Sequence, residues 1–332
     1  MEQILKFLGP TFLTLKEFGF IYGIQGMLVR RNLEKLWFEE CVTMSKYNVF
    51  HMPSTSLWSC MKDLTDIGAD RVPFGIAELD EVTNTWNTSF FPLKSKPSKH
   101  RIAKITTVYE SKGDILSVKD LFYTKQRERK SWWRQMSENP SIYYMSETKK
   151  ENGKEYAEIQ AQFPFGNIVV ETINFKNSAK KLLPGVENGE RLKIVEQVVS
   201  LDWGCLAFLC DGYIEIKGSK EIQMHPKLVA YKAYCKAIIA PEDDESTRQD
   251  LNYLTSYVIE LLREKGVESV NVNDIKNPEH FKVAYIITVD SESLKSGLVK
   301  LVCQRTLCGE IVHITSMAKR MYDLCVVCKV TE

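Results

Sequence analysis

The spacing of apolar residues divides the first part of the chain into helices and strands. Between Met27 and Met44 the apolar residues recur at helical spacing, and a second helix is expected over 56–67. Between these helices the run YNVFHM predicts a strand that stops at Pro53, because proline has no N–H to donate to a sheet. The runs PFGIAELDEV and RIAKITTVYE predict two further strands.

A longer helix is expected from Ser117 to about Met136. Ser117 suits an N-cap, and Asp120 supplies a first-turn acid. The middle of the segment reads KQRERK, followed by two tryptophans. Trp132 or Trp133 could stack on nucleic-acid bases, but their helical spacing with Phe122 favours a core position for at least one of them.

The following segment is rich in strands. The runs SIYYMSE, EYAEIQAQFPF, NIVVETINF and RLKIVEQVVS alternate as strands do. Phe163 to Gly166 is interpreted as the end of one strand and a tight turn into the next. A helix over 202–213 then closes a domain assigned to residues 1–218, which is predicted to be α+β with an antiparallel sheet and helices.

Residues 219–332 show a different pattern and are assigned to a second domain. AYCKAIIA, VESVNV, VAYIITV and LVKLVCQ predict strands, and a last helix lies near the C-terminus. Ser246 or Thr247 is expected to cap a helix that stops at Gly266. This alternation predicts a small α/β domain with a mixed, mostly parallel sheet.

Composition narrows the functional classes. The chain has 332 residues, of which 44% are hydrophobic and 26% charged, as is usual for folded soluble proteins. It contains no apolar run of about 18 residues. The opening MEQILKFLGPTF lacks the features of a secretory signal and of a transit peptide, so an imported protein would be represented here by a trimmed form. The net charge is +1, so any contact with nucleic acid must come from local patches.

The cysteines favour a reducing compartment and no metal. There are nine, an odd number that does not suit a disulfide framework. Four lie near the C-terminus and could form a zinc site on spacing alone: Cys303, Cys308, Cys325 and Cys328. Their apolar surroundings favour buried thiols instead, and the five histidines lack ligand spacing, so no metal site is expected.

Three separated stretches resemble one enzyme family. YGIQGMLVRRNLEKLWFEE (22–40), RVPFGIAEL (71–79) and FPFGNIVVETI (163–173) occur in the order of the first signature, the second signature and the amino-acid-binding turn of glycyl-tRNA synthetases. The resemblance implies a class II aminoacyl-tRNA synthetase-like domain over 1–218 and an anticodon-binding-like domain over 219–332.

The departures from that family fall on its catalytic positions. Arginines grip phosphates bidentately during amino-acid activation. The second signature would place an Arg and a Glu where this chain has Asn84 and Trp86, and the third would place an Arg at Trp203. Val169 replaces one pocket glutamate, and only Glu171 remains. The resemblance therefore implies a degenerate active site, with no catalytic residue and no cofactor.

A narrower resemblance is to the accessory (beta) subunits of mitochondrial DNA polymerase gamma. It is carried by SWWRQMSENPS (131–141), QFPFGNIVVETI (162–173), LDWGCLAFLCDGY (201–213), MHPKLVAYKA (224–233) and VDSESLKSGLVKL (289–301). The resemblance implies a protein of the mitochondrial matrix and its nucleoids that binds the catalytic subunit and raises its DNA affinity and processivity. Vertebrate members dimerise through a helical hairpin between the first two signatures. Only 44 residues separate Gly26 from Arg71, which implies an insect-like member in a 1:1 heterodimer without that homodimer contact.

Two groups of cations are candidates for sequence-independent contact with DNA phosphates. The first is Lys94, Lys96, Lys99 and Arg101, and the second is Lys125, Arg127, Arg129, Lys130 and Arg134. The alternative is that both are merely solvated surface.

For the polymerase contact we predict an apolar strand face in the second domain. Its candidates are Gly297, Leu298, Val299 and Leu301, with Leu298 and Leu301 on opposite faces of the strand. The alternative is that helices cover both faces. Two other functions remain open: an active glycyl-tRNA synthetase-like enzyme, and a tRNA-binding protein that retains the anticodon-type domain.

Overall fold

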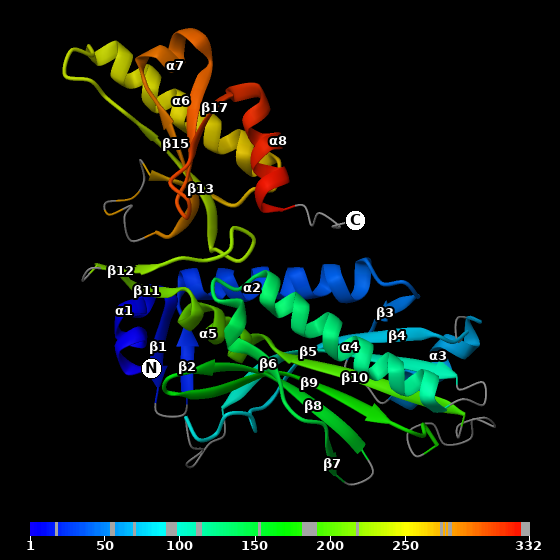
Figure 1. Cartoon of the computed structure of the whole chain (residues 1–332). Helices are drawn as coiled ribbons and strands as arrows, with labels where there is room; N and C mark the ends of the chain where they lie inside the picture. The colour runs from blue at the N-terminus through cyan, green and yellow to red at the C-terminus, as the bar shows by residue number, and fades with distance from the viewer. Residues whose placement is uncertain are drawn as a thin grey trace. The chain divides into compact units, whose positions relative to one another are not determined.

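The computed structural model describes residues 1–16, 19–53, 57–68, 71–90, 98–110, 115–151, 154–180, 191–216, 219–272, 275, 277 and 281–326. The chain folds into two compact units, and each is described by itself (Figure 1). Unit 1 comprises Met1–Gly9, Leu13–Ile21 and Leu33–Asp211, and unit 2 comprises Pro10–Phe12, Tyr22–Asn32 and Gly212–Glu332.

Unit 1 is built on an eight-stranded sheet. The strand order is β3 (Val49–His51), β4 (Phe74–Thr83), β5 (Lys99–Glu110), β10 (Leu192–Ser200), β9 (Gly166–Lys176), β8 (Lys154–Phe163) and β6 (Tyr143–Met145), and β7 (Lys149–Glu151) also pairs with β8. Every pairing is antiparallel except that of β3 with β4. The antiparallel sheet predicted for this part of the chain is confirmed. A separate pair joins β1 (Leu13–Lys16) to β2 (Gly19–Tyr22).

The helices up to residue 211 are α1 (Glu2–Phe12), α2 (Ile24–Phe38), η1 (Glu39–Thr43), α3 (Leu57–Asp66), α4 (Ile115–Gln135), η2 (Pro140–Ile142) and α5 (Leu201–Asp211), and the first part of α2 belongs to unit 2. Helix α4 already includes Ile115, so the prediction that Ser117 is its N-cap is wrong. Both Trp132 and Trp133 are buried, which confirms the core position expected for at least one of them.

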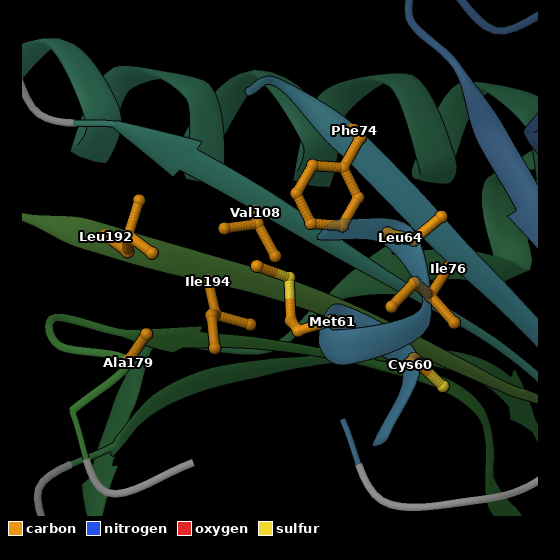
Figure 2. Close-up of a cluster of buried hydrophobic side chains, with 9 residues drawn as sticks. All are labelled: Cys60, Met61, Leu64, Phe74, Ile76, Val108, Ala179, Leu192 and Ile194. Carbon is orange, nitrogen blue, oxygen red and sulfur yellow. The ribbon is translucent and has the colours of Figure 1, made fainter. Parts of the chain in front are cut away.

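The two faces of the large sheet differ. On one face, Phe175 packs against Phe122 of α4 with ring centroids 5.7 Å apart, and Phe208 of α5 stacks on Trp133 of α4. On the opposite face, α3 contributes Cys60, Met61 and Leu64 to an apolar cluster with strand residues such as Val108 and Ile194 (Figure 2). Because side chains alternate along strands, neighbouring residues of β5 serve both cores.

The turn between β8 and β9 is the one expected from the sequence. Phe163 pairs with Gly166, leaving Pro164 and Phe165 as a two-residue loop. Further along, the register shifts between Ile159 and Gln160. Because a bulge of this kind adds one residue to a strand, the side chains after it on β9 point to the opposite face from the one that strict alternation would give. Glu171 is the first of these residues to pair with β8 again.

Unit 2 contains the hairpin of β11 (Tyr213–Ile216) and β12 (Ser219–Ile222) and a five-stranded sheet. The order in the sheet is β14 (Ser269–Asn271), β13 (Tyr231–Ala237), β15 (Val283–Val289), β16 (Leu298–Cys303) and β17 (Gly309–His313). The sheet is mixed, as predicted, but two of its pairings are parallel and two antiparallel instead of mostly parallel. The boundary predicted after residue 218 falls inside the β11–β12 hairpin, and the functional division at that point stays a prediction.

The helices that follow residue 212 in unit 2 are α6 (Glu245–Glu264), α7 (Ser291–Ser296) and α8 (Ile314–Cys325). The Asp244 carboxylate caps α6 by accepting from the Thr247 N–H, so the predicted caps Ser246 and Thr247 lie inside the helix. A carboxylate at this position also suits the positive end of the helix dipole. Helix α6 packs on β13 and β14 and continues to Glu264, close to the predicted stop at Gly266.

Candidate functional site

Three residues that the resemblance to synthetases assigns to catalytic positions, Asn84, Trp86 and Trp203, meet in unit 1. The Asn84 side-chain oxygen accepts hydrogen bonds from the Trp203 indole N–H at 3.2 Å and from the Trp86 backbone N–H at 3.0 Å. Asn84 and Trp203 are both buried, although 119 residues separate them in the sequence. The fold therefore joins these positions through an amide–indole contact, where the resemblance expects arginine.

Aromatic rings surround this contact. Trp203 packs edge-on against Phe20 at 5.4 Å and at a tilt against Phe90 at 6.4 Å between ring centroids. Trp86 packs edge-on against His100, whose Nδ1 lies 2.9 Å from the Ser200 hydroxyl. Burial lowers the pKa of His100, against the opposing charge of Asp202. The cluster is thus apolar and favours neutral groups over a triphosphate.

The β-bulge separates Val169 and Glu171, the two positions that the resemblance assigns to an amino-acid pocket. Val169 pairs with Gln160 and Glu171 with Ile159, which are adjacent residues of β8 and so face opposite sides of the sheet. The Val169 backbone bonds to the Asn87 side chain through both its N–H and its carbonyl, at 2.9 and 3.0 Å. Glu171 faces α4 instead and does not share a side of the sheet with Val169.

Glu171 forms a buried ion pair with Arg129. The guanidinium donates to the carboxylate at 2.8, 3.0 and 3.1 Å, and the Trp133 indole N–H adds a hydrogen bond at 2.7 Å. Arg129 also lies 4.1 Å from the centroid of the Trp132 ring. Burial would lower the pKa of Arg129, but Cys41 and Glu171 outweigh it and raise that pKa further above its usual range. The expectation that Arg129 contacts DNA does not fit this position.

A cleft of about 640 Å³ adjoins this ion pair in unit 1, and sequence reasoning missed it. Its lining includes Lys125, Arg129 and the buried Gln197. Lys125 also pairs with Glu128 at 2.8 Å. Two cations of the KQRERK run therefore line a cleft, which a charge pattern alone could not indicate.

The other cations of the second group, Arg127, Lys130 and Arg134, lie along one side of α4. Arg127, Lys130 and Arg134 follow each other at intervals of three and four residues, which places them on one helical face. Arg127 is exposed and donates to the Thr124 hydroxyl, while Lys130 and Arg134 are half-buried. Arg134 also donates to the Tyr143 carbonyl at 2.9 Å. The three cations span about 10 Å along the helix axis.

The cations of the first group, Lys94 to Arg101, differ in their surroundings. Lys94 and Lys96 lie outside the described residues, and Lys99 is exposed at the start of β5. Arg101 grips the Glu34 carboxylate with two N–H groups, at 2.5 and 3.1 Å, and the hydrogen bond to Glu34 raises the pKa of Arg101. The guanidinium of Arg101 is thus held by a carboxylate of the same chain.

In unit 2, strand β16 buries one face and exposes the other. Val299 and Leu301 are core residues, whereas Leu298 is 44% exposed. This arrangement agrees with the predicted opposite orientation of Leu298 and Leu301 and does not fit burial of both faces. Gly297 ends α7 at a φ of 69°, and a Cβ there would lie 2.7 Å from the His313 ring. Of the four interface candidates, only Leu298 presents an exposed side chain.

The exposed face continues onto β17, which the sequence analysis did not assign as a strand. Leu298 pairs with His313 and Lys300 with Ile311, so these side chains share one face. Ile311 is 72% exposed. Leu298, Lys300, Ile311 and His313 together form what we call the open sheet face.

The described residues contain no group of three or more His, Cys, Asp or Glu side chains suited to a metal ion. Cys328, part of the zinc alternative, lies outside the described residues. Among the helices described, none is both long and apolar enough to cross a membrane.

Comparison with known proteins gives a consistent set of relatives. The chain is 24% identical over 227 residues to "DNA polymerase subunit gamma-2, mitochondrial" of Drosophila melanogaster, covering 61% of this chain and 62% of the relative. This chain is similar to gamma-2 subunits of DNA polymerase. It is 23% identical over 221 residues to the Xenopus laevis protein of that name, covering 58% and 46%. It is 24% identical over 294 residues to the mouse "DNA polymerase subunit gamma-2", covering 76% and 60%.

The chain therefore spans about half to three fifths of the length of these curated relatives. No family model matches it. The relatives agree with the resemblance to polymerase gamma accessory subunits noted in the sequence, and they do not test the relation to synthetases.

Proposed function

We propose that this protein is a non-catalytic accessory subunit of the mitochondrial replicative DNA polymerase. It binds the catalytic subunit and raises its DNA affinity and processivity in the matrix nucleoid. The observation that carries the proposal is the similarity to gamma-2 subunits from an insect and from vertebrates. The Asn84–Trp203 contact supports it, because an amide and an indole replace the groups that would bind ATP.

The deciding experiment is primer extension by the cognate catalytic subunit, with and without this protein, across a salt series. Longer products and better salt tolerance on addition would support the accessory role. Unchanged products, together with no complex on a sizing column, would refute it. An ATP–pyrophosphate exchange assay with glycine runs in parallel, and turnover above background would favour the synthetase-like enzyme instead.

For the contact with the catalytic subunit we propose the open sheet face. A protein interface needs exposed apolar groups at its centre with polar groups at its rim. Leu298 and Ile311 supply exposed apolar groups from adjacent strands, and Lys300 supplies a polar group beside them. Val299 and Leu301 support this face from the core and are not themselves contacts.

For direct DNA contact we propose the α4 cations Arg127, Lys130 and Arg134, together with Lys99. Arg129, Lys125 and Arg101 are left out because each is held by a carboxylate. Reversal of Arg127 and Lys130 to glutamate should lower the slope of log affinity against log salt by about 2, since each phosphate contact contributes about 0.9. The double variant Lys149→Glu/Lys150→Glu, an equal charge change at two exposed sites, is the matched control. An unchanged slope in the double variant would remove α4 from the DNA contact.

We propose a 1:1 heterodimer and an insect-like member of the family. Residues 27–70 contain the rest of α2, η1, β3 and α3 in their described part, and these elements occupy the segment where vertebrate members carry their dimerising hairpin. Analytical ultracentrifugation of this chain with the catalytic subunit tests the proposal. A complex containing two copies of this chain would overturn it.

A further inference from the structure

Two cysteines face each other where β16 and β17 meet. Cys303 ends β16, and Cys308 directly precedes β17. The last register pair is Val302 with Gly309, and the Cys303 N–H donates to the Cys308 carbonyl at 2.9 Å. Opposed residues of an antiparallel pair have Cα atoms about 4.5–5.5 Å apart, within the range of about 4.4–6.8 Å that a disulfide requires.

Both sulfur atoms also lie close to the turn residue Thr306. The Cys308 thiol points to the Thr306 carbonyl, with Sγ 3.7 Å from the oxygen. The Cys303 sulfur accepts hydrogen bonds from the side chain and backbone of Thr306. One turn residue therefore contacts both sulfur atoms, which places both thiols at the same turn.

These cysteines differ from the others in the described residues, which are buried. Burial raises the pKa of Cys41 to about 11 and that of Cys235 to about 12. Burial acts in the same direction on Cys303, but hydrogen bonds from Thr306, Arg305 and Tyr285 lower its pKa below the ordinary value. Cys303 is half-buried and Cys308 exposed, so oxidants can reach this pair.

We propose that Cys303 and Cys308 form a reversible dithiol–disulfide pair that reacts with small disulfides such as oxidised glutathione. The Cys303 thiolate attacks one glutathione sulfur, breaks the glutathione disulfide and releases one glutathione thiolate. The Cys308 thiolate then attacks the Cys303 sulfur, forms the internal bond and releases the second glutathione. The two protein thiols are oxidised, and their two protons pass to the two reduced glutathione molecules.

The disulfide would close the turn between the strands that carry Leu298 and Ile311, so oxidation would fix the geometry of the open sheet face. The thiol chemistry itself does not depend on the proposed polymerase role, because it is measured on the isolated full chain.

Peptide mapping tests the pair directly. The full chain is incubated with oxidised glutathione, the remaining thiols are blocked, and the protein is digested with trypsin, which cuts after Arg305 between the two cysteines. The expected product joins peptides 301–305 and 306–319 through one disulfide and is lost on reduction. A product joining Cys303 to Cys325, or free thiols at both positions, would overturn the proposal.

Serine variants test the order of the two steps. Cys308→Ser should accumulate glutathione on Cys303, because the second thiol that would release it is missing. Cys303→Ser should leave Cys308 mostly free at the same time point. Equal trapping in both variants would refute the assignment of Cys303 as the attacking thiol. Thermal melting in reducing buffer checks that both variants remain folded.

Discussion

The sheets of the two units use their surfaces in opposite ways. In unit 1, Asn84 and Trp203 are joined by a hydrogen bond and packed among aromatic rings, where the resemblance to synthetases expects arginines. In unit 2, Leu298 and Ile311 leave apolar surface exposed on adjacent strands. Unit 1 thus buries core-like side chains around Asn84, while unit 2 leaves apolar groups accessible on its sheet, which is the pattern expected of a contact surface.

The units also differ in how they treat buried ionisable groups. Unit 1 buries a charged guanidinium and compensates it fully with Glu171. Unit 2 holds His225 near the cations Lys227, Arg305 and Lys232, which favour its neutral form. The stability of the Arg129 site depends on the Glu171 carboxylate, whereas that of the His225 site depends on pH. Mutation of the ion pair should therefore weaken the first, and acid should weaken the second.

The largest effect is expected for Arg129→Ala. Removing one partner of a buried ion pair leaves the Glu171 carboxylate uncompensated, which costs about 3–5 kcal/mol of unfolding free energy. Urea denaturation measures the loss. Arg127→Ala, on the exposed side of α4, is the control and should change stability by less than about 0.5 kcal/mol. Equal effects of the two variants would contradict the burial of Arg129. The double variant Arg129→Met/Glu171→Leu should recover most of the loss, because it removes both charges together.

Acid should weaken unit 2 through His225. Burial and three nearby cations lower the pKa of His225 to about 4, against about 6.5 in the unfolded chain. The unfolded state therefore binds more protons between these values, so this contribution is fully present above pH 6.5 and is lost as the pH falls toward 4. The loss amounts to about 3 kcal/mol of unfolding free energy.

The measurement is urea denaturation of the wild type and of His225→Gln at several pH values. The variant should lose less stability between pH 7 and 4 than the wild type does. The pKa of His100 is also lowered by burial and acts in the same direction, but it is common to both proteins and cancels in the difference. Parallel pH profiles would refute the role of His225.

A smaller effect is expected at the Asn84–Trp203 contact of unit 1. Asn84→Leu removes the acceptor that serves both the Trp86 N–H and the Trp203 indole, and leaving buried donors without it costs about 1–3 kcal/mol. A double-mutant cycle with Trp203→Phe measures how much of this cost belongs to the Asn84–Trp203 contact. Strictly additive losses would show that the two side chains are not coupled.

The sequence predicted those parts of the fold that depend on local patterns. The Phe163–Gly166 turn, the alternating strands around it and the extent of α6 all follow from turn residues and apolar periodicity. Only the resemblance to synthetases predicted that Asn84 and Trp203 lie close together, because no local pattern links residues so far apart in the chain.

The burial of Arg129 was not predictable in the same way. KQRERK has the pattern of a surface charge run, and the partner Glu171 lies 42 residues further along the chain. A bulge decides which face Glu171 occupies, and bulges leave little trace in residue spacing. Strand β17 escaped prediction because Ile311 is exposed, so its apolar side chain does not mark a buried face.

The smallest energetic change is expected at the open sheet face, and it tests the comparison most directly. Leu298→Asp should leave the unfolding free energy of the isolated chain within about 0.5 kcal/mol of the wild type, since surface substitutions of this kind rarely exceed that. Its affinity for the catalytic subunit should fall at least about tenfold, because a charge at the centre of an apolar contact must be desolvated. Ile67→Asp, the same kind of change at another exposed apolar residue, is the matched control for loss of surface hydrophobicity.

Isothermal titration of each variant with the catalytic subunit provides the measurement. If both variants bind as the wild type does, the open sheet face is not the contact surface, and the exposure of Leu298 and Ile311 needs another explanation. If both weaken binding equally, the effect is one of general surface charge. Only a selective loss in Leu298→Asp, repeated in Ile311→Asp on the adjacent strand, would support the view that the sheet of unit 2 stays open because a partner covers it.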